Sequence, residues 1–215
     1  MVSDIGVVVG MAAEARIARQ LGWRIAVGGG TATGAERAAR ELIERGARAL
    51  ISLGLAGGLD PALRPGTVIV PSAVIDGEHR YPTDPRLSQI LGGATPHLLL
   101  AAQTVVASAA EKRRLHGATG AAVIDLESGA VARAAAAHGI PFAALRVTCD
   151  PAQRSLPPAA LAALDPHGAV AIRRLLVSLL MQPAQIPALL ALAREATAAR
   201  RSLLTRVRQI VPKPG

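Results

Sequence analysis

The sequence predicts an α/β fold, and two observations carry the prediction. Apolar runs typical of buried strands recur along the 215-residue chain, and stretches with charged residues on one helical face lie between them. This alternation is the pattern of an α/β domain. Hydrophobic residues make up 51% of the chain and charged residues 18%, so the chain can bury one good-sized core. We expect one domain over residues 1–210 and a disordered tail over residues 211–215.

The first half of the chain is expected to alternate between strands and helices. Apolar runs predict strands at residues 5–10, 24–27, 49–53, 68–70 and 74–75. Charges repeated at helical spacing predict helices at residues 12–21 and 35–45. Clustered glycine, proline and polar residues predict loops at residues 28–34, 57–65 and 76–85.

The second half continues the alternation. Apolar runs predict strands at residues 104–107, 121–126 and 142–149. Helical spacing predicts helices at residues 109–115 and 128–138. From residue 161 onward the chain is expected to be helical, with breaks at Pro166, Pro183 and Pro187.

The cysteine, histidine and serine residues argue against several classes of site. Cys149 is the single cysteine and lies in an apolar run, so neither a disulfide framework nor a thiolate metal site can be built. The five histidines lack metal-ligand spacing, so no metal is expected. No serine lies in a nucleophile-elbow motif. The N-terminus lacks the basic region and cleavage site of an export signal, so a cytoplasmic location is expected.

The last fifty residues are strongly basic. They carry eight lysine and arginine residues against one acid, Glu195, and so account for most of the net charge of +9. Basic segments commonly bind the phosphate groups of lipids or nucleic acids. Aromatic residues make up only 1% of the chain, which argues against stacking on single-stranded nucleic acid. We therefore expect no nucleic-acid partner and prefer lipid headgroups.

Residues 189–210 predict an amphipathic helix. Apolar residues share one broad face, and arginines repeat every seven residues along its flank, at Arg194, Arg201 and Arg208. We favour a terminal helix that packs on the domain over a helix that lies on an anionic membrane surface. A membrane span over residues 175–193 is disfavoured because polar residues and two prolines interrupt it.

Two acids follow predicted buried strands, Glu127 and Asp150. Ligands of open α/β sheets bind outside the carboxyl ends of the strands, so we expect both carboxylates to face a common cavity. Each acid has a structural alternative. Glu127 lies at a helix start, where acids are favourable, and Asp150 precedes Pro151 in a pairing common in turns.

Two glycine-containing segments also follow strands, Gly10-Met11-Ala12-Ala13-Glu14 and Gly54-Leu55-Ala56-Gly57-Gly58-Leu59. Glycine allows the backbone to approach a ligand closely. Together with Asp125-Leu126-Glu127-Ser128-Gly129 and Arg146-Val147-Thr148-Cys149-Asp150, they resemble the nucleoside phosphorylase and nucleosidase superfamily, over most of the chain. The resemblance implies a three-layer α/β/α domain with a central mixed β-sheet that cleaves the N-glycosidic bond of a purine nucleoside.

The resemblance also implies roles for individual residues. Asp150 would protonate or hydrogen-bond N7 of the leaving base, and Glu127 would accept the ribose hydroxyls. Glu14 would orient an attacking water, although it could equally be a first-turn helix acid. Leu126 replaces a methionine that contacts the sugar, and Asp125 precedes it.

The remaining site residues bear on the attacking group. The backbone of Ala56 and Gly57 would approach the ligand, and Arg146 would tune the surroundings of Asp150 or serve instead as a plain ion-pair partner. Leu55 stands where phosphorylases tend to carry serine or threonine, so one phosphate-binding hydroxyl is missing. Water and inorganic phosphate as co-substrate both stay open, and no other cofactor is expected.

The segment from Gly57 to Gly66, the Glu111-Lys112 pair and the arginine-rich tail resemble the hopanoid-associated phosphorylase branch. This resemblance implies release of adenine from adenosylhopane, a lipid-linked purine nucleoside, with phosphorolysis slightly favoured and with peripheral contact at the inner membrane. The alternatives are a methylthioadenosine/adenosylhomocysteine nucleosidase and a non-catalytic member that binds lipid or nucleic acid. Relatives assemble as dimers or larger oligomers, so a homo-oligomer is expected.

Overall fold

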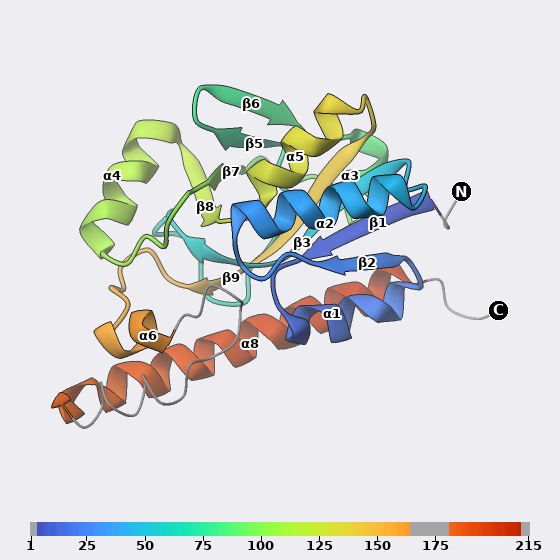
Figure 1. Ribbon diagram of the computed structural model, residues 1–215. Coiled ribbons are helices and arrows are strands. Elements are labelled where there is room, and N and C mark those ends of the chain that lie inside the picture. The colour runs from blue at the N-terminus through green and yellow to red at the C-terminus, as the bar shows by residue number, and fades with distance from the viewer. Residues whose placement is uncertain (1–3, 164–180, 212–215) are drawn as a thin grey trace.

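The computed structural model describes residues 4–163 and 181–211, whose strands form one mixed sheet (Figure 1). The nine strands are β1 (Ile5–Val9), β2 (Arg24–Val27), β3 (Ala49–Gly58), β4 (Val68–Ile69), β5 (Ala73–Asp76), β6 (His79–Pro82), β7 (Leu98–Ala101), β8 (Ala121–Asp125) and β9 (Phe142–Asp150). Their order is β2-β1-β3-β8-β7-β5-β6, and β9 pairs with β3 and β4. β3 runs parallel to β1 and β9 but antiparallel to β8, so the sheet is mixed as predicted.

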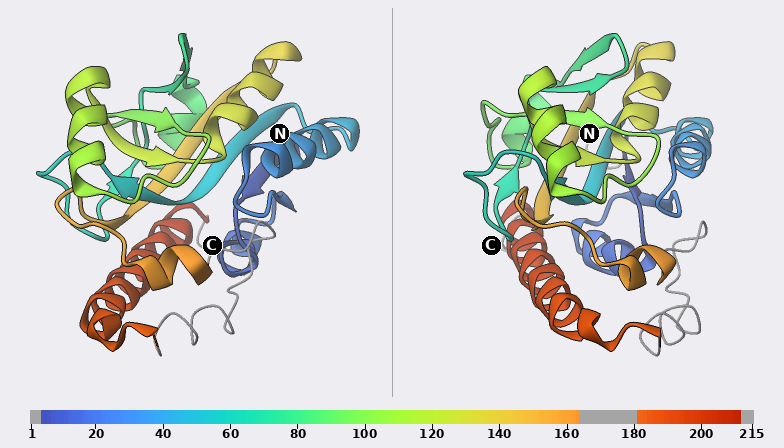
Figure 2. Two further views of the ribbon diagram at one scale, coloured as in Figure 1. Left: turned by 60° about the vertical axis from the view of Figure 1, so that its left-hand side comes forward. Right: turned by 90° about the vertical axis from the view of Figure 1, so that its left-hand side faces the viewer.

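Helices cover both faces of this sheet and complete the expected three layers (Figures 1 and 2). They are α1 (Ala12–Ala18), α2 (Ala32–Glu44), α3 (Pro85–Ile90), α4 (Ala109–Thr119), α5 (Ser128–Ala137), α6 (Pro158–Ala163) and α8 (Ile186–Ile210), with short 3-10 turns at Arg19–Leu21 and Pro183–Gln185. α2 and α5 pack together on one face, and α1 and α8 pack on the other.

Alternation along the central strands divides the core between the two faces. On β3, Leu50 and Ala56 point to the α2 and α5 face, whereas Ile51 and Leu53 point to the α1 and α8 face. The α2 and α5 layer is built largely from buried alanines, which allow helix and sheet to approach closely. The α1 and α8 layer uses larger aliphatic side chains, among them Leu203 of α8.

Three elements differ from the sequence predictions. The turn expected at Gly57-Gly58 is wrong, because β3 continues to Gly58 through backbone pairing with β9. The loop expected at residues 76–85 instead contains β6 and leads into α3, whose first turn is capped by Asp84. The strand expected at residues 104–107 is absent there; the strand β7 lies at Leu98–Ala101, where leucines pair with β5 and β8.

Element ends are set by local chemistry. α2 begins at Ala32, three residues earlier than predicted, because the Thr31 side chain accepts a hydrogen bond from the Gly34 amide. Pro183 and Pro187 lie in first turns, where a missing amide costs little.

Val211 is half-buried against the α1 and α8 layer, while Pro166 and residues 212–215 lie outside the described residues. Within residues 4–163 and 181–211, none of the helices is both long and apolar enough to cross a bilayer.

Candidate active site

Arg146 is fully buried and organises a cluster of polar side chains at the ends of β1, β3, β8 and β9. Its Nε lies 2.6 Å from an oxygen of Asp125, and its Nη2 lies 3.2 Å from an oxygen of Glu127. Nη2 also donates to the hydroxyls of Ser52 (2.6 Å) and Ser128 (3.0 Å). These bonds lock the guanidinium in one orientation, as a buried charge requires.

The third nitrogen of this guanidinium, Nη1, is buried without a hydrogen-bond partner among the described residues. It lies in the space beside Gly54, and Oε1 of Glu14 would be 2.8 Å from a Cβ built on that glycine. A buried N–H group without a partner is costly. The free donor and the Glu14 carboxylate therefore define a place where a polar oxygen of a ligand or water can bind.

Asp125 is the residue that links β8 to α5. One of its oxygens accepts the backbone N–H of Ser128 (3.1 Å), and the other accepts the Ser128 hydroxyl (2.6 Å) as well as Arg146 Nε. Both oxygens are therefore occupied. Asp125 orients Arg146 and the start of α5, and the structure gives it a supporting role within the cluster.

Glu14 joins the first turn of α1 to β3. Its Oε2 accepts the backbone N–H of Met11 and its Oε1 accepts the backbone N–H of Leu55, each at 2.9 Å. The first bond belongs to a capping box at the helix start. The second bond is long-range and fixes the carboxylate against β3. Glu14 therefore both caps α1 and lies within the cluster.

Gly10 and Gly54 make room for these acids. A Cβ built on Gly10 would collide with Oε1 of Glu127, and one on Gly54 would collide with Arg146 Nη1. Neither glycine has a positive φ. Their role in the structure is thus close approach of backbone to the charged groups.

Glu127 has an unusual protonation equilibrium for a glutamate. Burial raises its pKa to about 8; the charge of Arg146 opposes the shift, and the charges of Asp125 and Glu14 add to it. The same carboxylates raise the pKa of Arg146, although burial alone would lower it. At neutral pH Glu127 therefore carries a proton and can donate as well as accept a hydrogen bond.

Asp150 ends β9 but does not join this cluster. The register between β3 and β9 shifts at Cys149, so Ala56 pairs with Thr148 and Gly57 pairs with Asp150. An extra residue in a strand bends it and re-aims the following side chain. Oδ1 of Asp150 lies 3.4 Å from a Cβ built on Gly57, and the Cys149 thiol donates to it at 3.2 Å.

The Arg146 cluster and Asp150 both lie beside the glycine-containing end of β3. That Glu127 and Asp150 face a common cavity stays a prediction. Arg146 pairs with Gly54 across the two strands, and Asp150 pairs with Gly57, about 10 Å further along. Both groups therefore flank the same glycine-rich end of β3.

Lys112 of α4 is the partner of Asp150, and no pattern in the sequence predicts this pairing. Its ammonium forms an ion pair with Oδ2 of Asp150, and both side chains are almost completely buried. Burial, and then the charge of Asp150, hold the pKa of Cys149 well above its ordinary value, so the thiol remains a donor. Asp150 thus has a cation on one oxygen and a thiol on the other.

The other residues predicted for the site lie around the Arg146 cluster and the Lys112–Asp150 ion pair. Leu55 contributes its backbone amide to Glu14, and its side chain packs with the α1 and α8 layer. Ala56 is buried against the α2 and α5 layer. Leu126 is half-buried and lies between Asp125 and Glu127 in the chain. Ser52 was not predicted; a lone hydroxyl inside the apolar run of β3 is the signal that was available.

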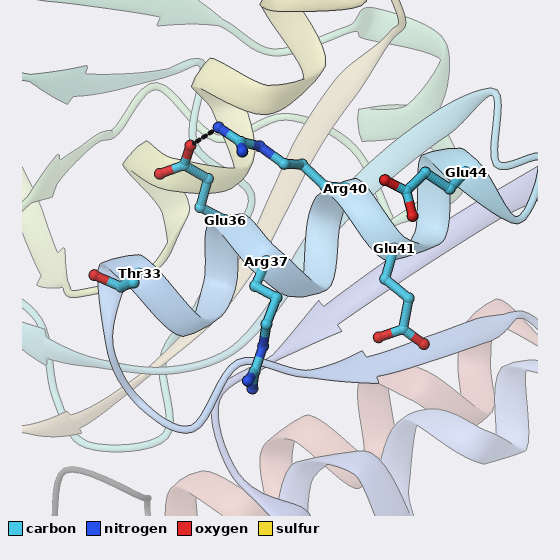
Figure 3. A pocket seen from close by; sticks show the side chains of 6 residues that line it. All are labelled: Thr33, Glu36, Arg37, Arg40, Glu41 and Glu44. Atoms are coloured by element: carbon cyan, nitrogen blue, oxygen red, sulfur yellow. Dashed lines mark hydrogen bonds and ion pairs between the residues drawn. The ribbon is translucent and has the colours of Figure 1, made fainter.

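A surface hollow of about 480 Å³ lies elsewhere, along the exposed side of α2 (Figure 3). Its lining comes from this one helix: Thr33, Glu36, Arg37, Arg40, Glu41 and Glu44. Glu36 and Arg40 pair with each other across it. The hollow contains none of the predicted site residues. Over the same described ranges, His, Cys, Asp and Glu side chains form no group of three or more suited to a metal ion.

The family model of the Phosphorylase superfamily matches residues 24–101 and 98–180. The matched segments cover well over half of the chain, so the chain belongs to this superfamily. Comparison with curated protein sequences gave no match.

Solved structures with the same fold include nucleosidases. An S-adenosylhomocysteine nucleosidase from Streptococcus pyogenes, in complex with 5-methylthiotubericidin, is 17% identical with a TM-score of 0.66, and 99% of each chain is covered. The futalosine hydrolase of Helicobacter pylori is 15% identical with a TM-score of 0.68, covering 97% of this chain and 99% of its own. A 5′-methylthioadenosine/S-adenosylhomocysteine nucleosidase from Colwellia psychrerythraea, in complex with adenine, is 18% identical with a TM-score of 0.65, covering 83% and 94%.

Proposed function

We propose that this protein cleaves the N-glycosidic bond of a purine nucleoside, with water as the attacking group. The observation that supports it most is the buried cluster of Glu14, Glu127 and Arg146, in which Arg146 Nη1 has no hydrogen-bond partner beside Gly54. The superfamily match and the nucleosidase structures with the same fold support this reaction class.

The reaction needs one group that stabilises the sugar, one that positions the attacking water and one that protonates the leaving base. The cluster supplies the first two. Breaking the bond to the base leaves a positively charged sugar, which neighbouring carboxylates stabilise. Glu127, protonated at neutral pH, can both donate to and accept from a ribose hydroxyl. Arg146 Nη1 can donate to the oxygen of a water whose hydrogen Glu14 accepts, which directs that oxygen toward the sugar.

The charges of this cluster favour water over phosphate. Three carboxylates, from Glu14, Asp125 and Glu127, surround the single guanidinium of Arg146. Even with a proton on Glu127, the negative groups outnumber the positive one, and a phosphate ion would be repelled. Leu55 also lacks the hydroxyl that a phosphate would accept a bond from. The resemblance to the hopanoid-associated branch pointed instead to phosphorolysis, so the attacking group needs a direct test.

For the substrate we propose a lipid-linked adenine nucleoside of the adenosylhopane type. The resemblance to the hopanoid-associated branch supports it. So does α8, whose first turns expose Ile186 and Leu190 while Arg200 and Arg201 are exposed further along. An apolar start with basic residues beyond it suits peripheral contact with an anionic bilayer, and a homo-oligomer is part of the same proposal. The nucleosidase neighbours favour 5′-methylthioadenosine as the competing substrate.

An adenine-release assay tests the reaction. We expect release without phosphate from the wild-type chain and a loss of about 10²-fold or more in Glu14→Gln. Glu44→Gln, an exposed glutamate on α2, is the matched control and should retain the wild-type rate. Strict dependence on added phosphate would contradict attack by water, and no release from any purine nucleoside would contradict the function itself.

The same assay separates the substrates. Faster release from a hopanoid nucleoside presented in phosphatidylglycerol vesicles than from 5′-methylthioadenosine would support the lipid-linked substrate. Equal or faster release from 5′-methylthioadenosine would favour the short thio-nucleoside.

A further inference from the structure

Lys112 uses all of its donors inside the protein. Besides the ion pair with Asp150, its Nζ donates to the backbone oxygens of Pro151 (3.2 Å) and Arg154 (3.1 Å). An ammonium group has three N–H bonds. Each has an acceptor here, and the side chain is 1% exposed, so the geometry is that of a charged and fully oriented lysine.

The surrounding backbone holds this contact in place. α4 begins with a cap in which the Ser108 hydroxyl accepts the Glu111 amide at 3.1 Å. The loop after β9 is tied to the same helix start, because the Ala109 amide donates to the Ser155 hydroxyl at 3.0 Å. The Leu156 amide donates to the carbonyl just before this cap, at 2.8 Å. α4 and the loop therefore form a frame around Lys112 and Asp150.

The other charged groups near Asp150 are already engaged. Arg154 pairs with Glu195 of α8 at 2.9 Å. The Cys149 thiol donates to the second oxygen of Asp150. Among the described residues, Lys112 is thus the cation in direct contact with this acid.

This pairing changes what Asp150 can do by itself. Both oxygens of Asp150 act as acceptors in this geometry, one from the Lys112 ammonium and the other from the Cys149 thiol. A purine leaves more readily when it is protonated, and general acid catalysis contributes about 10² to 10⁴ in rate. If Asp150 delivers that proton, a neighbouring group must first supply it.

We propose that Lys112 is the source of the proton that Asp150 passes to the leaving base. This inference rests on the proposed function. As the glycosidic bond breaks, its electron pair stays on the base. An N–H bond of Lys112 breaks and leaves its electron pair on Nζ, the proton moves to Asp150, and Asp150 transfers a proton to the base nitrogen. Lys112 ends as a neutral amine, Asp150 as a carboxylate, and the base as a neutral product; solvent recharges the amine when product leaves.

A comparison of leaving groups tests Lys112 in the full chain. Adenine needs a proton to leave, whereas p-nitrophenolate from p-nitrophenyl β-D-ribofuranoside leaves as a stable anion. Lys112→Met should lower kcat for adenine release about 10²-fold and that for nitrophenol release by less than about threefold. An equal loss on both substrates would mean that Lys112 only supports the fold, and the inference would be overturned.

Lys112→Arg separates charge from proton supply. Arginine keeps the positive charge but does not give up a proton in proteins. Adenine release should stay as low as in Lys112→Met, and a wild-type rate would overturn the transfer of a proton. Arg113→Met is the matched control, since this neighbouring basic residue on α4 is exposed and should leave both rates unchanged.

A double variant guards against misfolding. Lys112→Met alone leaves a buried carboxylate without its partner, whereas Lys112→Met with Asp150→Asn removes both charges. If Lys112 acts through Asp150, adding Lys112→Met to Asp150→Asn changes adenine release by less than about twofold. A further large loss overturns the inference. A wild-type chain that releases neither adenine nor nitrophenol would contradict the proposed function. Lys112 variants that release adenine at the wild-type rate would contradict this inference alone.

Discussion

Glu127 is the residue whose charge depends most on its neighbours. Its pKa of about 8 in the folded chain lies far above the ordinary value of a glutamate in the unfolded chain. Between roughly pH 4.5 and pH 8 the folded state therefore binds more protons than the unfolded state. The stability that the neutral form contributes is complete below this window and is lost as the pH rises through the folded pKa.

Glu127→Gln tests this linkage. Glutamine cannot ionise, so the variant escapes the loss of stability that the wild type suffers as the pH rises. We expect the Tm of the variant relative to wild type to be several degrees higher at pH 8 than at pH 5. Glu44→Gln on exposed α2 should show no such trend. Parallel pH profiles for wild type and Glu127→Gln would contradict the buried, protonated glutamate.

The acids of the candidate site can be predicted from the sequence more readily than their partners. Glu14, Glu127 and Asp150 each follow an apolar run, which is a local signal. Lys112 has no such signal, because α4 is a polar helix with five basic or acidic residues and only the fold shows which of them is buried. The pairing of Asp150 with Gly57 depends on a one-residue bulge in β9, which apolar periodicity does not reveal.

Among the elements, β3 carries the most structural constraint. It pairs with β1 along its first half, with β9 along nearly its whole length, and with β8 at its end. The charged cluster approaches its backbone at Gly54, and Asp150 approaches at Gly57. A side chain added to the middle of this strand must therefore displace groups that are already fixed by hydrogen bonds.

Gly54→Ala should impair activity more than folding. The new Cβ would overlap Arg146 Nη1, which cannot move away because acids and hydroxyls hold the guanidinium. Displacement of such a group by about 1 Å can cost about 10²-fold in rate. Gly117→Ala is the matched control, because that exposed glycine of α4 has open space around it and alanine should stabilise the helix slightly. Normal adenine release from Gly54→Ala would contradict the close approach.

Most elements could be predicted because their periodicity is strong. The strands β1, β2, β8 and β9 follow predominantly apolar runs, and the structure confirms them. β6 is a polar edge strand that ends at Pro82, so its pairing with β5 decides its conformation. α3 had a usable signal in Asp84 followed by Pro85, a cap and a first-turn proline. Val105 and Val106 favoured a strand by residue type, yet Val105 is exposed in a loop.

At the scale of the whole molecule, α8 closes one face of the sheet. Its residues Ala199, Leu203 and Val207 are fully buried against β9, α1 and their neighbours. Its earlier turns project past the sheet, as Figure 2 shows, and expose Ile186 and Leu190. The packed part of α8 agrees with the favoured sequence interpretation of a terminal helix on the domain.

Leu203→Ala measures how much this helix stabilises the domain. Removing a fully buried leucine should lower the free energy of unfolding by about 2–5 kcal/mol, because a cavity forms between α8 and the sheet. Leu190→Ala removes the same atoms from an exposed position of the same helix and should change stability by less than about 0.5 kcal/mol. Chemical denaturation monitored by circular dichroism gives both values, and similar losses in the two variants would contradict the described packing.

The position of α8 also has a consequence for synthesis of the chain. The apolar face formed by Val7, Leu53 and Leu145 is built from strands that leave the ribosome well before residues 186–210. Chains fold from the N-terminus during translation, so this face stays open to water until α8 emerges. In that interval the nascent chain exposes an apolar surface of the kind that general chaperones for newly made polypeptides bind.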